Sequence, residues 1–132
     1  MKIILNKSYG GFGASYEAYE LYAKKMGIEL YAYKFDFGLL EWVRTTGTSE
    51  PCIIYSRVNC DKIKDLKDTL YLSGGMRTDK TFIEVVEELG DKASSSLSEL
   101  KVFEIPDNSD YIVSDYDGIE TLYYSESKIY ER

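Results

Sequence analysis

The order of apolar and polar positions along the chain predicts alternating strands and helices. Residues 2–15 (KIILNKSYGGFGAS) combine a short apolar run with three glycines in four positions, which predicts a buried strand, a glycine-rich turn and a helix start. Apolar residues then recur at helical spacing as far as Met26. Ser15 is placed to cap this helix and Gly27 to end it.

The middle of the chain predicts two further strands. Residues 28–35 (IELYAYKF) are rich in β-formers, and their position after a strand and a helix makes a right-handed crossover with parallel pairing the first expectation. Residues 52–58 (CIIYSRV) predict a third strand. Residues 36–50 predict only a short strand or a turn of helix near residues 39–43, and residues 61–68 a short solvated helix or loop.

The last part of the chain carries the clearest local signals. A stripe of apolar residues predicts a helix that begins after Thr78 or Asp79 and ends at Gly90; the stripe consists of Phe82, Ile83, Val85, Val86 and Leu89. Residues 100–105 (LKVFEI) predict a strand. Asp117-Gly118 lies between two β-like runs, residues 111–116 and 119–124, and is the signal for a type I′ hairpin turn.

Together these elements predict an α+β fold in one domain over residues 1–132. A chain of 132 residues and 15.2 kDa suits one hydrophobic core. We expect a mixed β-sheet of about five strands, with the two main helices on one face and the C-terminal β-hairpin at the edge.

Composition and charge exclude several classes of function. The net charge of −7 argues against nucleic acid and anionic membrane surfaces as partners. No apolar run approaches the roughly 20 residues that cross a bilayer, so we expect a cytoplasmic protein without a signal peptide. The chain has no histidine, which removes His-containing nucleophile pairs and metal sites. Cys52 and Cys60 are expected to be reduced thiols, and no cofactor or metal is expected.

Tyrosine is unusually frequent, with 13 in 132 residues. Its large ring and polar tip suit oligomer interfaces as well as half-buried positions. We therefore expect a homo-oligomer, a dimer or higher.

Two blocks of sequence resemble small uncharacterised proteins encoded by bacteriophages and prophages. The first is residues 2–31, with the YGGFG motif, and the second joins RTDKTFIEVVEELGDKAS at residues 77–94 to LKVFEIPDNSDYIVSDYDGIE at residues 100–120. Such proteins often carry cysteine where this chain has Ser8, so Ser8 does not support a thiol mechanism. The resemblance implies a phage context, in which small accessory proteins commonly counter host defence inside the infected bacterium.

The glycine-rich turn is the candidate ligand site. Glycines let backbone amides approach a ligand closely, and a helix N-terminus adds partial positive charge, which predicts a pocket for an anion. The expected ligand-binding residues are Lys7, Tyr9, Gly10, Gly11, Phe12, Gly13 and Ser15, with Arg57 and Arg77 as phosphate clamps.

Each of these features also has a purely structural interpretation. The glycines can serve a tight strand-to-helix turn with Phe12 packed inward, and Arg77 can pair with Asp79 to fix a turn. The loop matches neither a P-loop nor a complete dinucleotide-binding fingerprint, which disfavours a nucleoside triphosphatase. Carboxylates near the hairpin turn (Asp115, Asp117 and Glu120) are typical of a solvated turn and not of a metal site.

Three functions remain open. The leading hypothesis is a phage counter-defence protein that sequesters a small anionic, nucleotide-derived signalling molecule without chemistry, and so is not an enzyme. The second is an acidic inhibitor, in the manner of a DNA mimic, that binds a host defence protein. The third is a phosphodiesterase-like enzyme acting on nucleotide signals.

Overall fold

The computed structural model describes residues 1–46 and 52–125, and these form an α+β structure, as predicted. The described chain divides into two compact units. Unit 1 contains residues 1–19 and residues 72–125, and unit 2 contains the described part of residues 20–71. Unit 2 therefore lies in the sequence between the two segments that form unit 1. The expectation of a single domain stays a prediction.

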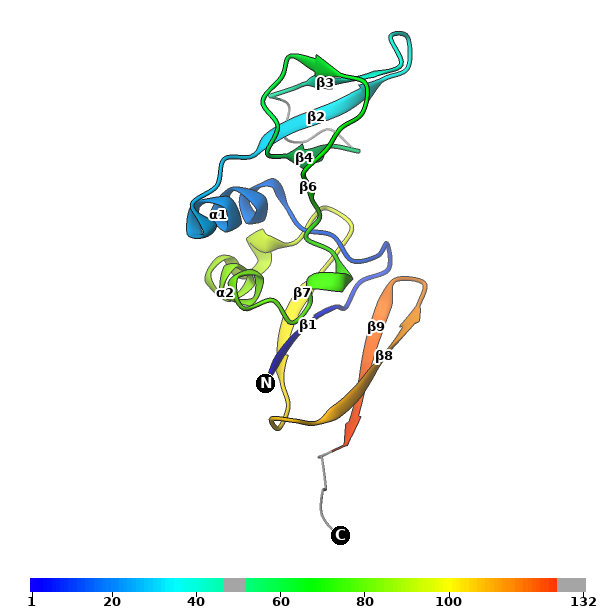
Figure 1. Ribbon diagram of the computed structural model, residues 1–132. Coiled ribbons are helices and arrows are strands. Elements are labelled where there is room, and N and C mark those ends of the chain that lie inside the picture. Colours follow the sequence, from blue (N-terminus) through cyan, green and yellow to red (C-terminus); the bar gives the residue numbers. More distant parts are fainter. Residues whose placement is uncertain (47–51, 126–132) are drawn as a thin grey trace. The chain divides into compact units, whose positions relative to one another are not determined.

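Unit 1 is built on a pair of antiparallel strands from opposite ends of the chain. β1 (Lys2–Asn6) pairs with β7 (Leu100–Glu104), with Ile4 opposite Val102. The helix α2 (Lys80–Leu89) lies on one side of this pair, and the hairpin of β8 (Asp110–Tyr116) and β9 (Ile119–Ser125) lies on the other (Figure 1). Two short 3₁₀ helices, η1 (Gly74–Met76) and η2 (Gly90–Ala93), flank α2 in the sequence.

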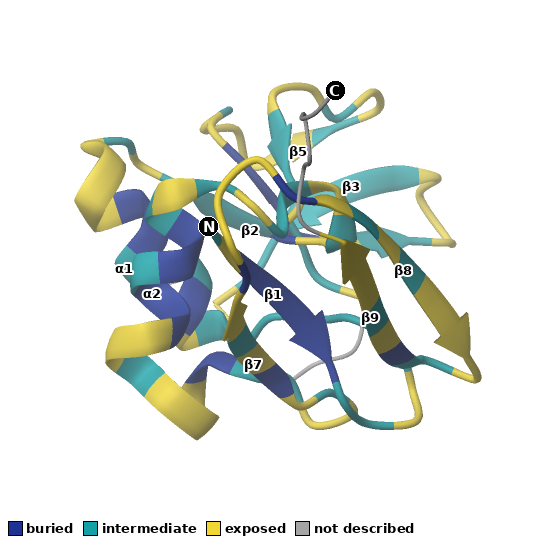
Figure 2. Ribbon diagram, turned by 90° about the horizontal axis from the view of Figure 1, so that it is seen from below, coloured by how far each residue is buried: buried dark blue, intermediate teal, exposed yellow. Residues whose placement is uncertain are grey.

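β1 is buried over four of its five residues, which explains its continuous apolar run (Figure 2). Successive side chains of a strand point to opposite faces. Ile3 and Leu5 pack with Ile105, and the hairpin covers this cluster with three partly buried side chains, Tyr111, Val113 and Leu122. Ile4 is fully buried on the other face of the strand. Both faces of β1 are thus buried in unit 1.

The local signals for α2 and the hairpin are confirmed. Asp79 caps α2, its carboxylate accepting a hydrogen bond of 2.9 Å from the amide of Phe82, and Gly90 ends the helix with a φ of 58°. In the hairpin, Asp117 and Gly118 both have positive φ, 52° and 94°, as a type I′ turn requires.

The helix after the glycine loop is also confirmed. α1 (Tyr16–Met26) begins in unit 1 and continues into unit 2. The Ser15 hydroxyl oxygen accepts a hydrogen bond of 3.1 Å from the amide of Ala18, and Gly27 follows the helix with a φ of 68°. Both caps therefore lie where the sequence predicts them.

Unit 2 is a five-stranded antiparallel sheet with the strand order β5-β3-β2-β4-β6. Its strands are β2 (Tyr31–Asp36), β3 (Glu41–Arg44), β4 (Ile54–Ser56), β5 (Lys62–Ile63) and β6 (Thr69–Leu70). Tyr33 is fully buried at its centre, where the phenol donates a hydrogen bond to the carbonyl of Val58 and accepts one of 3.0 Å from the amide of Cys60. Both cysteines are free and exposed.

Two expectations about strand pairing are wrong. β1 does not pair in parallel with β2, because the two strands belong to different units and every strand pair in the described residues is antiparallel. The described strands likewise form three separate sheets in place of one mixed sheet. The order strand, helix, strand predicted parallel pairing, but here the strand after α1 pairs within unit 2, and β1 pairs with β7 from the far end of the chain.

Candidate ligand-binding site

The glycine-rich loop between β1 and α1 has the backbone conformation that its glycines predict at two of three positions. Gly10 and Gly11 have φ values of 113° and 92°, which side chains with a Cβ rarely adopt. Gly13 needs no such conformation, but a Cβ on it would lie 2.9 Å from the hydroxyl of Ser95. The loop therefore needs glycine for two different reasons, backbone conformation and close packing.

The turn of the β8–β9 hairpin lies directly against this loop. A Cβ on Gly118 would lie 2.4 Å from the amide nitrogen of Gly11 and 2.8 Å from that of Gly10. The amide of Gly10 also donates a hydrogen bond of 3.4 Å to the carbonyl of Asp117. The turn therefore covers the two amides expected to face an anion, and ligand binding by these amides stays a prediction.

Arg77 forms a buried ion pair with Glu120. Its two terminal nitrogens each lie 2.9 Å from one oxygen of the Glu120 carboxylate, and one of them also donates a hydrogen bond of 3.0 Å to the carbonyl of Ile4. The side chains of Arg77 and Glu120 are only 16% and 6% exposed. The guanidinium also lies over the ring of Phe12, 5.5 Å from its centroid.

This arrangement corrects the structural alternative for Arg77. Its partner is Glu120 and not Asp79, because the carboxylate of Asp79 caps α2. The expected phosphate clamp has its planar fork filled by a carboxylate of the same chain. Glu120, expected in a solvated turn, is in fact buried.

The charges of the pair stabilise one another. Burial by itself raises the pKa of the Glu120 carboxyl, but hydrogen bonds from Arg77 and from the amide of Asn6 outweigh burial and lower this pKa below its ordinary value. The pKa of Arg77 is raised, mainly by its hydrogen bonds to Glu120. Both groups are therefore charged at neutral pH.

Asn6 and Lys7, at the end of β1, connect the loop to the hairpin. The amide of Asn6 donates a hydrogen bond of 2.8 Å to the carboxylate of Glu120, and its side-chain nitrogen donates to the carbonyls of Ser8 and Gly118. The ammonium of Lys7 donates a hydrogen bond of 2.6 Å to the backbone carbonyl of Glu120. The pattern explains why residues with hydrogen-bonding side chains follow the apolar run.

A cleft of about 530 Å³ opens beside the loop, within unit 1. It is lined by Lys7, Ser8, Tyr9, Asp91, Ser94, Ser95, Ser98, Glu99 and Ile119. Two of the expected ligand-binding residues, Lys7 and Tyr9, are among them, and the ring of Tyr9 is 63% exposed. This volume falls within the range of small-molecule sites.

Three serines that line the cleft, Ser94, Ser95 and Ser98, were not among the ligand-binding residues expected from the sequence. Ser95 and Ser98 share a hydrogen bond of 3.0 Å, and the Ser98 hydroxyl donates one of 2.5 Å to the carbonyl of Gly13. Ser94 accepts a hydrogen bond from the amide of Leu100. The clustering of serine at positions 94–98 was the available signal, but a polar loop explained it equally well.

Three other expected site residues have structural roles or lie elsewhere. Ser15 caps α1, and its hydroxyl donates to the carbonyl of Lys92. Phe12 is partly buried, with its ring edge-on to that of Phe82 at 6.1 Å, which agrees with the inward packing considered above. Arg57 is exposed and belongs to unit 2. The structure thus brings Lys7, Tyr9 and the glycines together within unit 1, and a part for Arg57 in the same site stays a prediction.

No protein-family model, curated protein or solved structure matches this chain. Within residues 1–46 and 52–125, no group of three or more carboxylate or cysteine side chains is arranged to hold a metal ion. None of the helices in the same residues is long and apolar enough to cross a membrane.

Proposed function

We propose that the protein binds and sequesters a small, nucleotide-derived anion in the cleft beside the glycine loop, without changing it chemically. The observation that carries this proposal is the composition of the cleft wall, which combines an ammonium group, an exposed tyrosine ring and several hydroxyls in about 530 Å³. The resemblance to phage and prophage proteins supports a role in countering host defence.

Each part of the wall suits one part of such a ligand. The ammonium of Lys7 suits phosphate oxygens, and so does the hydroxyl of Ser94, which accepts a hydrogen bond from the amide of Leu100 and has one proton of its own to donate. The exposed ring of Tyr9 offers a stacking surface for a base. Lys7 donates one hydrogen bond to a backbone carbonyl, and an ammonium has three donors. Its charge is therefore able to serve a ligand without loss of its structural contact.

The carboxylates narrow the class of ligand. Among the described residues that line the cleft, Lys7 is the one cation, whereas Asp91 and Glu99 are acidic. A nucleoside triphosphate would place up to four negative charges near two more, which Coulomb repulsion disfavours. A ligand with one or two phosphate charges and free ribose hydroxyls fits better, because carboxylates accept hydrogen bonds from hydroxyls.

Isothermal titration against nucleoside monophosphates, cyclic mononucleotides, cyclic dinucleotides and ADP-ribose tests the proposal. We expect binding of at least one of these and its recovery intact, by mass spectrometry, after heat denaturation of the complex. Lys7→Ala should raise the dissociation constant about 10- to 100-fold, as expected for loss of a hydrogen bond to a charged group. Lys80→Ala is the matched control, because this lysine is exposed at the start of α2 in the same unit and lies outside the cleft.

The alternatives give different results. Recovery of an altered ligand would identify an enzyme of the phosphodiesterase type and contradict sequestration without chemistry. Absence of binding to the whole panel would contradict the proposal and favour the acidic inhibitor. In that case Asp117→Asn, which keeps a residue that tolerates positive φ, should weaken inhibition of a basic host partner, and Lys7→Ala should leave it unchanged.

A further inference from the structure

The β8–β9 hairpin has an outer face that nothing covers among the described residues. Val113 and Leu122 point inward to the core of unit 1, so the alternate residues of both strands point outward. Three of these are large and strongly exposed: Ile112, Tyr116 and Tyr123, at 67%, 72% and 56%.

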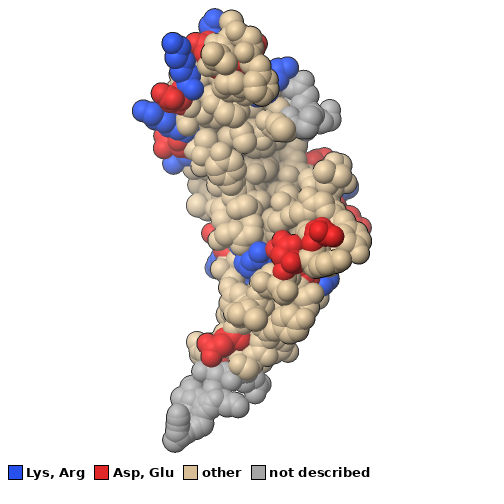
Figure 3. Space-filling model, turned by 90° about the vertical axis from the view of Figure 1, so that its right-hand side faces the viewer, with Lys and Arg blue, Asp and Glu red and all other residues tan. Residues whose placement is uncertain are grey.

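This outer face carries no charge at its six central positions. The register pairs Ile112 with Tyr123, Ser114 with Thr121, and Tyr116 with Ile119, so three uncharged rungs follow one another. In a chain with 30% charged residues, such a face is a departure from the average surface. Depletion of charge with enrichment of tyrosine is the compositional signal of an interface core. Figure 3 views the molecule from the side of the hairpin, and charged side chains are sparse over its lower half.

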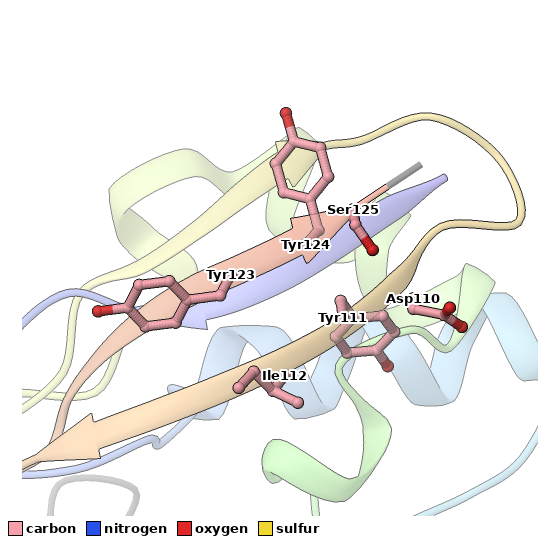
Figure 4. A pocket seen from close by; sticks show the side chains of 6 residues that line it. All are labelled: Asp110, Tyr111, Ile112, Tyr123, Tyr124 and Ser125. Carbon is pink, nitrogen blue, oxygen red and sulfur yellow. The ribbon is translucent and has the colours of Figure 1, made fainter. Parts of the chain in front are cut away.

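The three rungs are also complementary to themselves. A hollow of about 290 Å³ lies at the open end of the hairpin, lined by Asp110, Tyr111, Ile112, Tyr123, Tyr124 and Ser125 (Figure 4). The projecting ring of Tyr116 lies near the turn, two positions beyond Ser114, while Ile112 lies two positions before it. The hollow begins at Ile112 and Tyr123 and extends to Tyr111 and Tyr124, which belong to the inward face. On the outer face, Tyr116 and Ile112 are equally far from the Ser114–Thr121 rung, whose side chains are small.

We propose that this face is the interface of a homodimer, in which the hairpins of two copies pack face to face around a two-fold axis at the Ser114–Thr121 rung. The axis lies in the plane between the two faces, at right angles to the strands, so the strands of the two copies run in opposite directions. Tyr116 of each copy then packs on Ile112 and Tyr123 of the other. Such an isologous contact brings an uncharged face onto itself, so no like charges meet at the six central positions even though each copy carries a net charge of −7.

The size of the face sets the expected strength of the dimer. An aromatic side chain buries about 150–250 Å² when fully covered, so the exposed parts of Tyr116, Tyr123 and Ile112 offer on the order of 400 Å² per copy. A standard interface buries about 800 Å² per partner. The contact therefore suits a reversible dimer, with a dissociation constant in the micromolar range and not the nanomolar range.

Sedimentation equilibrium of the full chain from about 1 to 200 μM tests the proposal. We expect a reversible dimer whose dissociation constant rises at least about 30-fold with Tyr116→Glu, as for an interface hot spot. Leu97→Glu is the matched control: Leu97 is 65% exposed on unit 1 but outside the hairpin, and its variant should dimerise as the wild type does. The melting temperature of each variant shows that it is folded.

A cross-link tests the symmetry directly. In a Cys52→Ser/Cys60→Ser background, Ser114→Cys places one thiol near the axis, so a bismaleimide spanning about 10 Å, the spacing of packed sheets, should join two copies. Glu104→Cys, exposed on β7, should give no cross-linked dimer at the same concentration. A monomer across the whole concentration range would overturn the proposal, and so would a dimer that Tyr116→Glu leaves intact or that Leu97→Glu also breaks.

Discussion

Replacing Glu120 with alanine should destabilise unit 1 by about 3–5 kcal/mol, as found when one partner of a buried ion pair is removed. Arg77 would lose two charge-assisted hydrogen bonds of 2.9 Å while its guanidinium remains largely buried. Charge-assisted bonds contribute roughly 1.5–3 kcal/mol each. The amide of Asn6 would lose its acceptor at 2.8 Å, which adds roughly 1–3 kcal/mol. Added together, these contributions exceed the loss that we expect. We expect the smaller value because the guanidinium of Arg77 is 16% exposed, so water can partly replace the lost hydrogen bonds.

A second ion pair of unit 1 supplies the control. Glu87 accepts a hydrogen bond of 2.7 Å from Lys2, but the two side chains are 40% and 42% exposed. Exposed pairs contribute about 0–1 kcal/mol, so Glu87→Ala should have little effect. Both substitutions thus remove a glutamate side chain from an ion pair with a short N–O distance. The pair of Glu120 is buried, whereas the pair of Glu87 is exposed.

Native-state hydrogen exchange with peptide-level mass spectrometry measures the effect within unit 1. The amides of β1 and β7 should exchange faster in Glu120→Ala by a factor that corresponds to about 3–5 kcal/mol. Trp42, the single tryptophan, lies on β3, so its fluorescence reports the unfolding of unit 2 in the same samples. A loss below about 1 kcal/mol in β1 and β7, no larger than for Glu87→Ala, would refute the reasoning.

Two further predictions concern pH and the loop. The pKa of Glu120 is depressed in the folded protein, so its stabilising effect is present above its ordinary value of 4.5 and is lost as the pH falls toward the folded pKa. Between about pH 5 and pH 3, urea unfolding should therefore show a smaller loss of stability for Glu120→Gln than for the wild type. Gly118→Ala should cost about 2–3 kcal/mol, because its Cβ would meet the amide of Gly11 at 2.4 Å and its φ is 94°. Gly11→Ala is the control, because Gly11 also has a positive φ but an added Cβ would meet no atom within 4 Å. It should cost at least about 1 kcal/mol less in the same assay. Equal losses for the two variants would show that packing of the turn on the loop contributes nothing.

The sequence determined those parts of the structure whose interactions are local. Asp79 caps α2 through an amide three residues away, Ser15 caps α1 in the same way, and Asp117-Gly118 makes a turn between adjacent strands. In each case the residue type and its partner lie within one short segment, so one pattern of letters contains the whole interaction. The position of the glycine loop between a strand and a helix was predictable for the same reason.

The contacts that shape the candidate site join distant parts of the sequence, so only the tertiary structure shows them. Arg77 and Glu120 are 43 residues apart, Asn6 and Glu120 are 114 apart, and β1 finds its partner β7 from the other end of the chain. With 23 acidic residues in the sequence, no local pattern shows which of them neutralises a given arginine. The hairpin turn covers the amides of Gly10 and Gly11, and only the tertiary structure shows this contact. A contact between distant segments depends on their shapes in space and not on spacing along the chain.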